Sequence, residues 1–176
     1  IDIYAQAVDY EIKNNEKNLW EAYYKLGISY ERNNNWNEAE KYFLKSLGLF
    51  ENQPDVLNYL GYSYVDRNEK LDTAKEMIAN ALSQKSNDPY ILDSMAWYYY
   101  KVGLFEEALS LMEYASLLDP SDPTINEHYG DILWSVGRKI EARFFCQKSI
   151  DMGPEESSAE QIQRKKQEEW KCKTLK

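Results

Sequence analysis

A repeat with a period of about 34 residues runs through most of the sequence. Small residues mark it in three parallel series, with gaps of 34 or 35 residues inside each series. Small side chains at a fixed period are typical of helices that cross closely, with larger side chains filling the grooves on either side. The three series are Gly27, Gly61, Ala96, Gly130; Ala39, Ala74, Ala108, Ala142; and Ser46, Ala81, Ala115, Ser149.

The best preserved copy, residues 89–120, contains two stretches with apolar residues at helical spacing. Asp88 stands where a helix N-cap belongs, and Pro89 follows in the first turn, where a proline costs nothing. Gly103 lies between the two stretches, where a left-handed residue can end the first helix. This copy therefore predicts a helix hairpin, and a hairpin of this size buries both faces only by stacking on neighbours.

The four copies together resemble the tetratricopeptide repeat, whose signature is Leu-Gly-x2-Tyr, then Ala-x3-Phe, then Pro. The resemblance covers about residues 20–154 and extends to bacterial members of the family. It implies an all-α superhelix of about four helix-turn-helix units with a flanking helix at each end. The matching residues are Leu26, Gly27, Tyr30, Ala39 and Phe43; Leu60, Gly61, Tyr64, Ala74 and Ile78; Met95, Ala96, Tyr99, Ala108, Met112 and Pro120; and Tyr129, Gly130, Ala142, Cys146 and Pro154.

The repeat register predicts six segments. Residues 1–18 are expected to form the second helix of a partial preceding unit, and residues 155–176 a charged capping helix with a frayed end. The second unit carries one extra residue between Tyr64 and Ala74, which lengthens either the turn or the end of its first helix. The four units between the flanks are residues 20–53, 54–88, 89–122 and 123–154.

Composition excludes several classes of protein. The formal net charge of −9 disfavours nucleic-acid binding, because phosphate contacts need clustered Lys and Arg. No apolar run reaches the roughly 18 residues of a membrane span.

Cys146 and Cys172 are too few and too far apart to indicate a disulfide framework, and Cys146 is expected to act as a buried free thiol. The chain starts at Ile1 without a signal peptide, so we expect it to be a piece of a longer protein.

The sequence contains no recognisable catalytic constellation. The single histidine, His128, has Glu127 and Asp131 beside it, but a metal site usually needs three or four ligands and no other His or Cys has suitable spacing. We interpret His128 as a helix residue making ordinary hydrogen bonds. No phosphate loop or nucleophile elbow is present. We therefore predict a non-enzyme with no cofactor and no metal.

The resemblance places ligand contacts on the first helix of each unit, which lines the concave side of the superhelix. Carried over by register, the predicted lining is aromatic and acidic, with a single amide. Chaperone-binding members hold a carboxylate with Lys, Arg and Asn, and this lining lacks that set. The predicted groove residues are Tyr24, Asn58, Tyr62, Asp66, Asp93, Trp97, Tyr100, Glu127, Asp131 and Trp134.

The run of four aromatic residues from Trp97 to Tyr100 surrounds its helix, so its members cannot all face one core. The repeat register assigns Tyr99 to the core and offers Trp97 and Tyr100 to the groove. The alternative, given equal weight, packs Trp97 and Tyr100 against adjacent helices.

The leading functional hypothesis is a protein–protein interaction module that holds a basic or neutral segment with apolar anchors, the cation lying over an aromatic ring beside a carboxylate. A self-associating scaffold, hence a homo-oligomer, is a second hypothesis. A repeat arm of a larger enzyme, whose catalytic domain is elsewhere, is a third. The sequence does not distinguish a cytoplasmic from a periplasmic or envelope-associated location.

Overall fold

The computed structural model describes residues 2–14 and 18–153, and over these residues the α-helix is the only regular secondary structure. The predicted all-α fold is confirmed. Its nine helices in the described ranges are α1 (Asp2–Asn14), α2 (Leu19–Arg32), α3 (Trp36–Leu49), α4 (Pro54–Arg67), α5 (Leu71–Gln84), α6 (Pro89–Lys101), α7 (Phe105–Leu118), α8 (Pro123–Ser135) and α9 (Lys139–Asp151).

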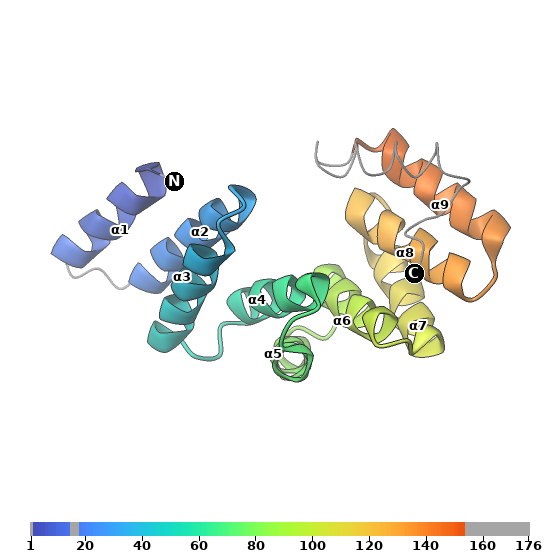
Figure 1. The fold of residues 1–176 in the computed structure, drawn as a ribbon, viewed down its shortest axis with the longest axis horizontal. Coiled ribbons are helices and arrows are strands. Elements are labelled where there is room, and N and C mark those ends of the chain that lie inside the picture. The colour runs from blue at the N-terminus through green and yellow to red at the C-terminus, as the bar shows by residue number, and fades with distance from the viewer. Residues whose placement is uncertain (1, 15–17, 154–176) are drawn as a thin grey trace.

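The helices pair into hairpins that follow one another along a curved path (Figure 1). The pairs α2/α3, α4/α5, α6/α7 and α8/α9 make the most extensive contacts. The first helices α4, α6 and α8 also stack on one another, while each second helix contacts the first helix of the next pair. We call α2, α4, α6 and α8 the inner helices and α3, α5, α7 and α9 the outer helices. This is the stacking that a hairpin repeat requires to bury both of its faces.

Local signals set the ends of the helices in the third hairpin as the sequence predicts. The carboxylate of Asp88 accepts hydrogen bonds from the backbone N–H groups of Tyr90 and Ile91, and Pro89 opens α6. Gly103 has a φ of +82° and ends the helix. The same left-handed conformation occurs at the equivalent position of every hairpin, at Asn34, Asn68 and Gly137. Glycine and asparagine recur here because they adopt positive φ at low cost.

The extra residue of the second unit lies in its turn. Asn68 is seven residues beyond Gly61, as Gly103 is beyond Ala96, so the register is intact up to the left-handed position. A second left-handed residue, Lys70 with φ +44°, then precedes α5. The Lys70 ammonium donates to Glu40 Oε1 at 2.5 Å, which ties this turn to α3 of the preceding hairpin.

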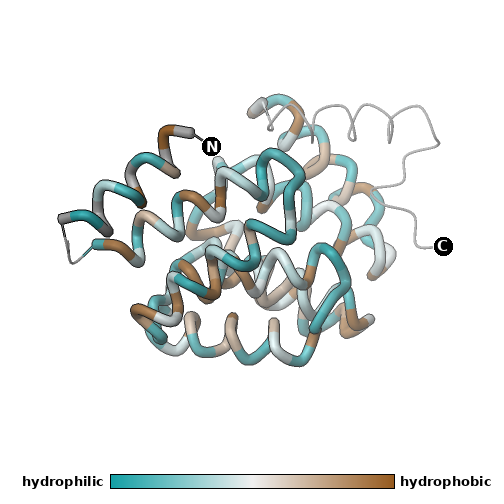
Figure 2. The backbone as a smooth tube through the Cα atoms, turned by 60° about the vertical axis from the view of Figure 1, so that its left-hand side comes forward, coloured by the Kyte–Doolittle hydropathy of each residue, from teal (hydrophilic) through white to brown (hydrophobic). Residues whose placement is uncertain are grey.

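The core forms where inner and outer helices cross at the small residues. The alanines of the second series are all fully buried, and a Cβ added to Gly61 would lie 2.7 Å from Ile78 Cγ1. Gly27 stands in the same relation to Phe43. The predicted reason for the small series, close helix approach, is confirmed. Along the helices, hydrophobic residues alternate with hydrophilic ones, as amphipathic helices require (Figure 2).

The third small series has a second role at the two ends of the array. Ser46 Oγ donates a 2.7 Å hydrogen bond to the backbone carbonyl of Trp20, and Ser149 Oγ makes the same bond to Pro123. Each serine thus ties the last turn of an outer helix to the start of its inner helix. The first unit differs at its start, because Asn18 caps α2 without a side-chain hydrogen bond.

The expectation of a free thiol at Cys146 is wrong. Cys146 is buried on α9 as predicted, at the crossing opposite Gly130, but it is disulfide-bonded. The number and spacing of cysteines in the sequence were a poor guide to the bonded state of this thiol. The sequence holds one other cysteine, Cys172, which lies outside the described residues. The predicted capping helix at 155–176 lies outside them too.

Candidate functional site

The ten predicted groove residues all lie on the inner helices, but they differ in exposure. Asp66 is exposed. Four others are partly exposed: Tyr24, Asn58, Tyr62 and Trp134. The remaining five are buried: Asp93, Trp97, Tyr100, Glu127 and Asp131. The accessible part of the predicted site therefore lies on α2 and α4, with Trp134 at the far end.

The aromatic run on α6 packs against the neighbouring inner helices. The indole of Trp97 is fully buried between two rings, stacked on His128 at a centroid distance of 4.0 Å and on Tyr100 at 4.6 Å. Tyr100 is 5% exposed, whereas Tyr99, which was expected in the core, is partly exposed. The exposures thus match the alternative in which Trp97 and Tyr100 pack on adjacent helices. The reason is that α6 is covered by inner helices on both sides.

A buried polar pair joins α6 to α8. His128 Nδ1 lies 2.8 Å from Asp93 Oδ1, and both side chains are at least nine-tenths buried. The pair sits beside the Trp97 ring that stacks on His128. Buried polar groups are stable only when they are hydrogen-bonded, and this pairing meets that requirement. The arrangement fits the interpretation of His128 as a structural helix residue.

A lysine near α4 shows which chemistry this surface accommodates. The ammonium of Lys101 lies 5.5 Å from the centre of the Trp97 ring and 3.8 Å from Asp66 Oδ1. It also donates a 2.9 Å hydrogen bond to the backbone carbonyl of Asp66. Trp97 Nε1–H donates to Asp66 Oδ1 at 3.4 Å. A cation over an aromatic face and beside a carboxylate is the combination that the sequence predicted for a ligand.

Tyr62 stands at the centre of the negative charge. Burial raises the pKa of its phenol well above the usual value, and the charges of neighbouring carboxylates raise it further. The largest of these contributions come from Asp66 on its own helix, Asp93 on α6 and Glu127 on α8, and Glu31 on α2 adds a smaller one. Carboxylates on all four inner helices thus contribute negative charge around one partly exposed ring. Negative charge converging on a ring attracts a cation.

Asn58, Tyr62 and Asp66 are spaced by four residues and form one line along α4, which we call the α4 stripe. The Asn58 Oδ1 atom accepts no hydrogen bond within the described part of the chain. Buried acceptors in this state are uncommon, because desolvation without a hydrogen bond costs about 1–3 kcal/mol. The stripe therefore combines an amide, a ring and a carboxylate in a row.

The α2 end of this surface is also aromatic. The ring of Tyr24 lies 5.9 Å from that of Tyr59, and the Tyr59 hydroxyl donates to Glu31 at 3.2 Å. Burial, with a smaller contribution from Asp55, raises the pKa of Tyr24 to about 12. Tyr59 was not among the predicted groove residues. The sequence feature that could have identified Tyr59 is its position two residues before the small residue Gly61. His128 has the same position relative to Gly130.

At the other end, Trp134 is partly exposed and lies beneath the ammonium of Lys139 at 5.3 Å. Burial raises the pKa of Tyr100 to about 12, and the charge of Asp131 adds to this effect.

Within residues 2–14 and 18–153, no three potential ligands gather as a metal site would require. None of the described helices is both long and apolar enough to cross a bilayer.

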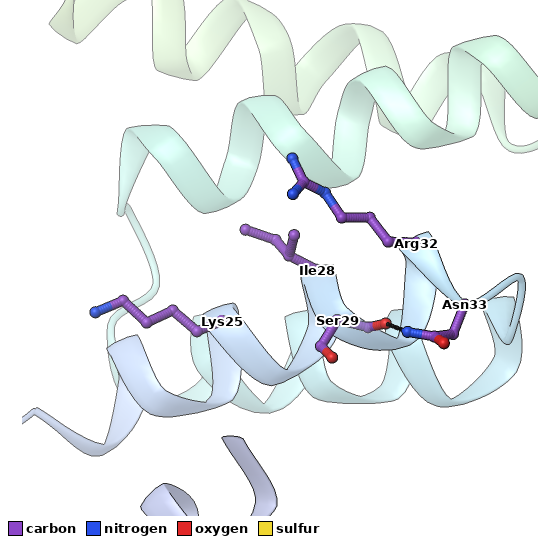
Figure 3. Close-up of a pocket in the computed structure, with 5 residues that line it drawn as sticks. All are labelled: Lys25, Ile28, Ser29, Arg32 and Asn33. Carbon is purple, nitrogen blue, oxygen red and sulfur yellow. Dashed lines mark hydrogen bonds between the residues drawn. The ribbon is translucent and has the colours of Figure 1, made fainter. Parts of the chain in front are cut away.

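A shallow depression of about 170 Å³ lies on α2 (Figure 3). Two cationic side chains, Lys25 and Arg32, stand on either side of Ile28 along the helix, and Ser29 and Asn33 complete the lining. Asn33 Nδ2–H donates to the Ser29 carbonyl at 2.7 Å. The lining carries two cations, and one of them, Lys25, forms an ion pair with Glu21 at 2.7 Å.

Comparison with known proteins gives matches in both halves of the chain. Two family models, each described as tetratricopeptide repeat, match residues 20–53 and 94–157. A TPR repeat-containing protein of Pseudomonas aeruginosa is 35% identical over 82 residues, which are 45% of this chain and 14% of that protein. The chain thus spans about one seventh of the length of that relative.

Solved structures share the fold at low sequence identity. A thermophilic TPR protein of Thermus thermophilus superposes with a TM-score of 0.69 at 14% identity, over 76% of this chain and 74% of that one. The Pseudomonas aeruginosa protein pilF gives a TM-score of 0.64 at 13% identity, over 96% of this chain and 84% of its own. At these identities, the likeness establishes the fold alone.

Proposed function

Because the chain belongs to the tetratricopeptide repeat family, whose members mediate protein–protein interactions or act as scaffolds and are generally non-catalytic, we propose a specific mode of binding. The α4 stripe and Tyr24 bind a protein segment that carries Lys or Arg next to an apolar side chain. The observation that supports this proposal is that the partly exposed Tyr62 lies where the charges of carboxylates on all four inner helices raise the pKa of its phenol, beside the contact of Lys101 with Asp66.

The three groups of the stripe would have different roles. The Tyr62 ring offers apolar area with little loss of rotamer entropy and takes a cation over its face. Asp66 is exposed and supplies a charge-assisted hydrogen bond at the rim. The Asn58 amide suits the backbone of an extended segment if its buried oxygen, which lacks a donor within the described residues, turns outward on binding. A segment rich in Asp or Glu would be repelled.

Lys101 supports the proposal because it already makes the contacts expected of a ligand lysine. Its ammonium lies between the Trp97 ring and Asp66, so a carboxylate and an indole at this spacing do hold a cation. Trp97 itself is fully buried, and a bound segment would contact Tyr62 rather than the indole.

Binding can be tested with two labelled dodecapeptides, one alternating Lys and Leu and the other alternating Glu and Leu. Fluorescence anisotropy in 50 mM and 200 mM salt should show that the lysine peptide binds more tightly, and more so at low salt. The double variant Tyr62→Ala/Asp66→Asn should weaken this binding by about tenfold or more, corresponding to about 1.4 kcal/mol, as expected for an aromatic anchor with a charge partner.

A matched control changes the same residue types on the outer helices. Tyr114 on α7 and Asp72 on α5 are both exposed, and Tyr114→Ala/Asp72→Asn should leave the affinity unchanged. Equal losses in the two double variants would mean non-specific attraction to an acidic protein. Equal affinity for the lysine and glutamate peptides would refute the proposed charge preference.

A further inference from the structure

Four aromatic rings form a continuous column across three inner helices, which we call the ring column. Tyr100 and Trp97 of α6 stack at a centroid distance of 4.6 Å, and His128 of α8 follows Trp97 at 4.0 Å. The imidazole also lies 6.0 Å from the ring of Tyr62 on α4. His128 therefore links the buried rings of α6 to the partly exposed ring of the α4 stripe.

Three buried carboxylates lie along the ring column. Asp93 Oδ1 of α6 is 2.8 Å from His128 Nδ1. Glu127 and Asp131 lie on α8 itself, one residue before His128 and three residues after it, and both are buried. Burial raises the pKa of the two end rings of the column, and the charges of Glu127 and Asp131 add to this effect. The single histidine of the chain thus stands in a strongly negative environment.

The other charged groups around α8 form pairs of their own. On α4, Asp66 Oδ1 lies 3.8 Å from the ammonium of Lys101. On the sides of α8 that meet α7 and α9, Glu113 and Glu141 both accept hydrogen bonds from Arg138, in the turn after α8. Each of these two cations stands beside a carboxylate, as His128 stands beside Asp93.

A charged imidazole suits this place better than a neutral one. A carboxylate within about 4–6 Å favours the protonated form of a histidine, and Asp93 is within hydrogen-bond distance. The face of Trp97 adds a cation–π attraction. Burial alone acts in the opposite direction. Loss of the proton, however, would leave Asp93 buried beside a neutral ring, which is costly for a carboxylate.

We propose that His128 is protonated in the free protein at neutral pH, and that its proton regulates binding at the α4 stripe. A basic segment binds weakly while the imidazolium is present and more tightly once His128 is neutral. This inference rests on the proposed function, because the ligand that the proton opposes is the cation over Tyr62.

The two positive charges would interact across the Tyr62 ring. A cation over an aromatic face lies within about 6 Å of the ring centroid, so it would lie within about 12 Å of the imidazole. Like charges at this distance repel in a partly buried site. Binding of the basic segment therefore lowers the pKa of His128, and by reciprocity the loss of the proton strengthens binding, by about threefold to tenfold.

The single histidine makes the proton directly observable by NMR. In protein labelled with carbon-13 at histidine Cε1, one signal reports the titration of His128 between about pH 5 and pH 9. The free protein should show an imidazolium at pH 7, and saturating Lys/Leu dodecapeptide in 50 mM salt should lower the pKa. A neutral imidazole at pH 7 in the free protein would overturn the proposal.

Affinity supplies the second readout, with the same peptide followed by fluorescence anisotropy. The Kd should fall by about threefold to tenfold from pH 6 to pH 9. Asp93→Asn should move this change to lower pH, because it removes the carboxylate that holds the proton. Asp72→Asn, an exposed change on α5, is the matched control and should not move it.

The outcomes separate this inference from the proposed function. Binding with equal affinity at pH 6 and pH 9, together with a His128 titration that the peptide does not shift, would refute the regulation alone. Absence of binding at every pH would refute the proposed function and the regulation with it.

Discussion

Adding one methyl group at Gly61 tests whether the repeat is held together by close helix crossings. A Cβ at this position would lie 2.7 Å from Ile78 Cγ1 and 3.2 Å from the carbonyl oxygen of Ala74. Ile78 is fully buried, so it cannot move aside into solvent. Forcing an extra methyl group into such a contact costs about 1–3 kcal/mol.

Helix propensity acts in the opposite direction, and a matched glycine measures it. Replacing a glycine inside a helix by alanine gains about 1 kcal/mol. Gly48 lies in α3 with open space around it, so Gly48→Ala should show this gain alone. Gly61→Ala should therefore be less stable than Gly48→Ala by about 1–3 kcal/mol, which corresponds to a difference of about 2–12 °C in melting temperature.

The measurement is thermal and urea unfolding followed by far-UV circular dichroism. Ile78→Ala alone should cost about 2–5 kcal/mol by leaving a cavity. Combined with Gly61→Ala it should cost at least about 1 kcal/mol less than the sum of the two, because the new methyl group occupies part of that cavity. Equal stabilisation by Gly61→Ala and Gly48→Ala would refute the close-crossing argument, and so would strict additivity in the cycle.

Three further predictions concern buried groups. Burial raises the pKa of Tyr100 to about 12, so its contribution to the free energy of unfolding is complete below pH 10 and is lost between pH 10 and 12. Over that window the stability of the unmodified protein should fall by about 2–3 kcal/mol more than the stability of Tyr100→Phe. Equal slopes of unfolding free energy against pH for the two proteins would contradict this. The buried His128–Asp93 pair predicts a loss of about 3 kcal/mol in His128→Phe, mostly recovered in His128→Phe/Asp93→Leu; a double variant as unstable as the single one would argue against the pair. Because Cys146 is disulfide-bonded, Ellman titration of the urea-unfolded, unreduced protein should find no free thiol at this position, and a peptide map with alkylated Cys146 would contradict the assignment.

Much of the fold could be predicted because the decisive signals are local and repeated. Gly27 and Gly61 mark helix crossings, and the period of 34 or 35 residues sets which helices meet. Asp88 and Gly103 mark helix ends by their own side-chain and backbone chemistry. Because the pattern occurs in four copies, each copy independently indicates the same repeat register.

The exposure of the site was harder to predict, because it depends on contacts between units. The register places Trp97 on the inner side of α6, but it does not reveal that His128 from α8 covers the indole. The bond between His128 and Asp93 spans 35 residues and depends on how α6 and α8 stack. The bonded state of Cys146 likewise has no local signal in the sequence.

The most direct test of the binding account is photo-crosslinking from position 62. With benzoylphenylalanine in place of Tyr62, irradiation in the presence of the Lys/Leu dodecapeptide should give a crosslinked product that excess unlabelled peptide removes. The same amino acid in place of Tyr114 should give little product, because α7 lies on the outer side of the array. Equal crosslinking from the two positions, or crosslinking only from position 114, would contradict the assignment of the α4 stripe as the binding surface.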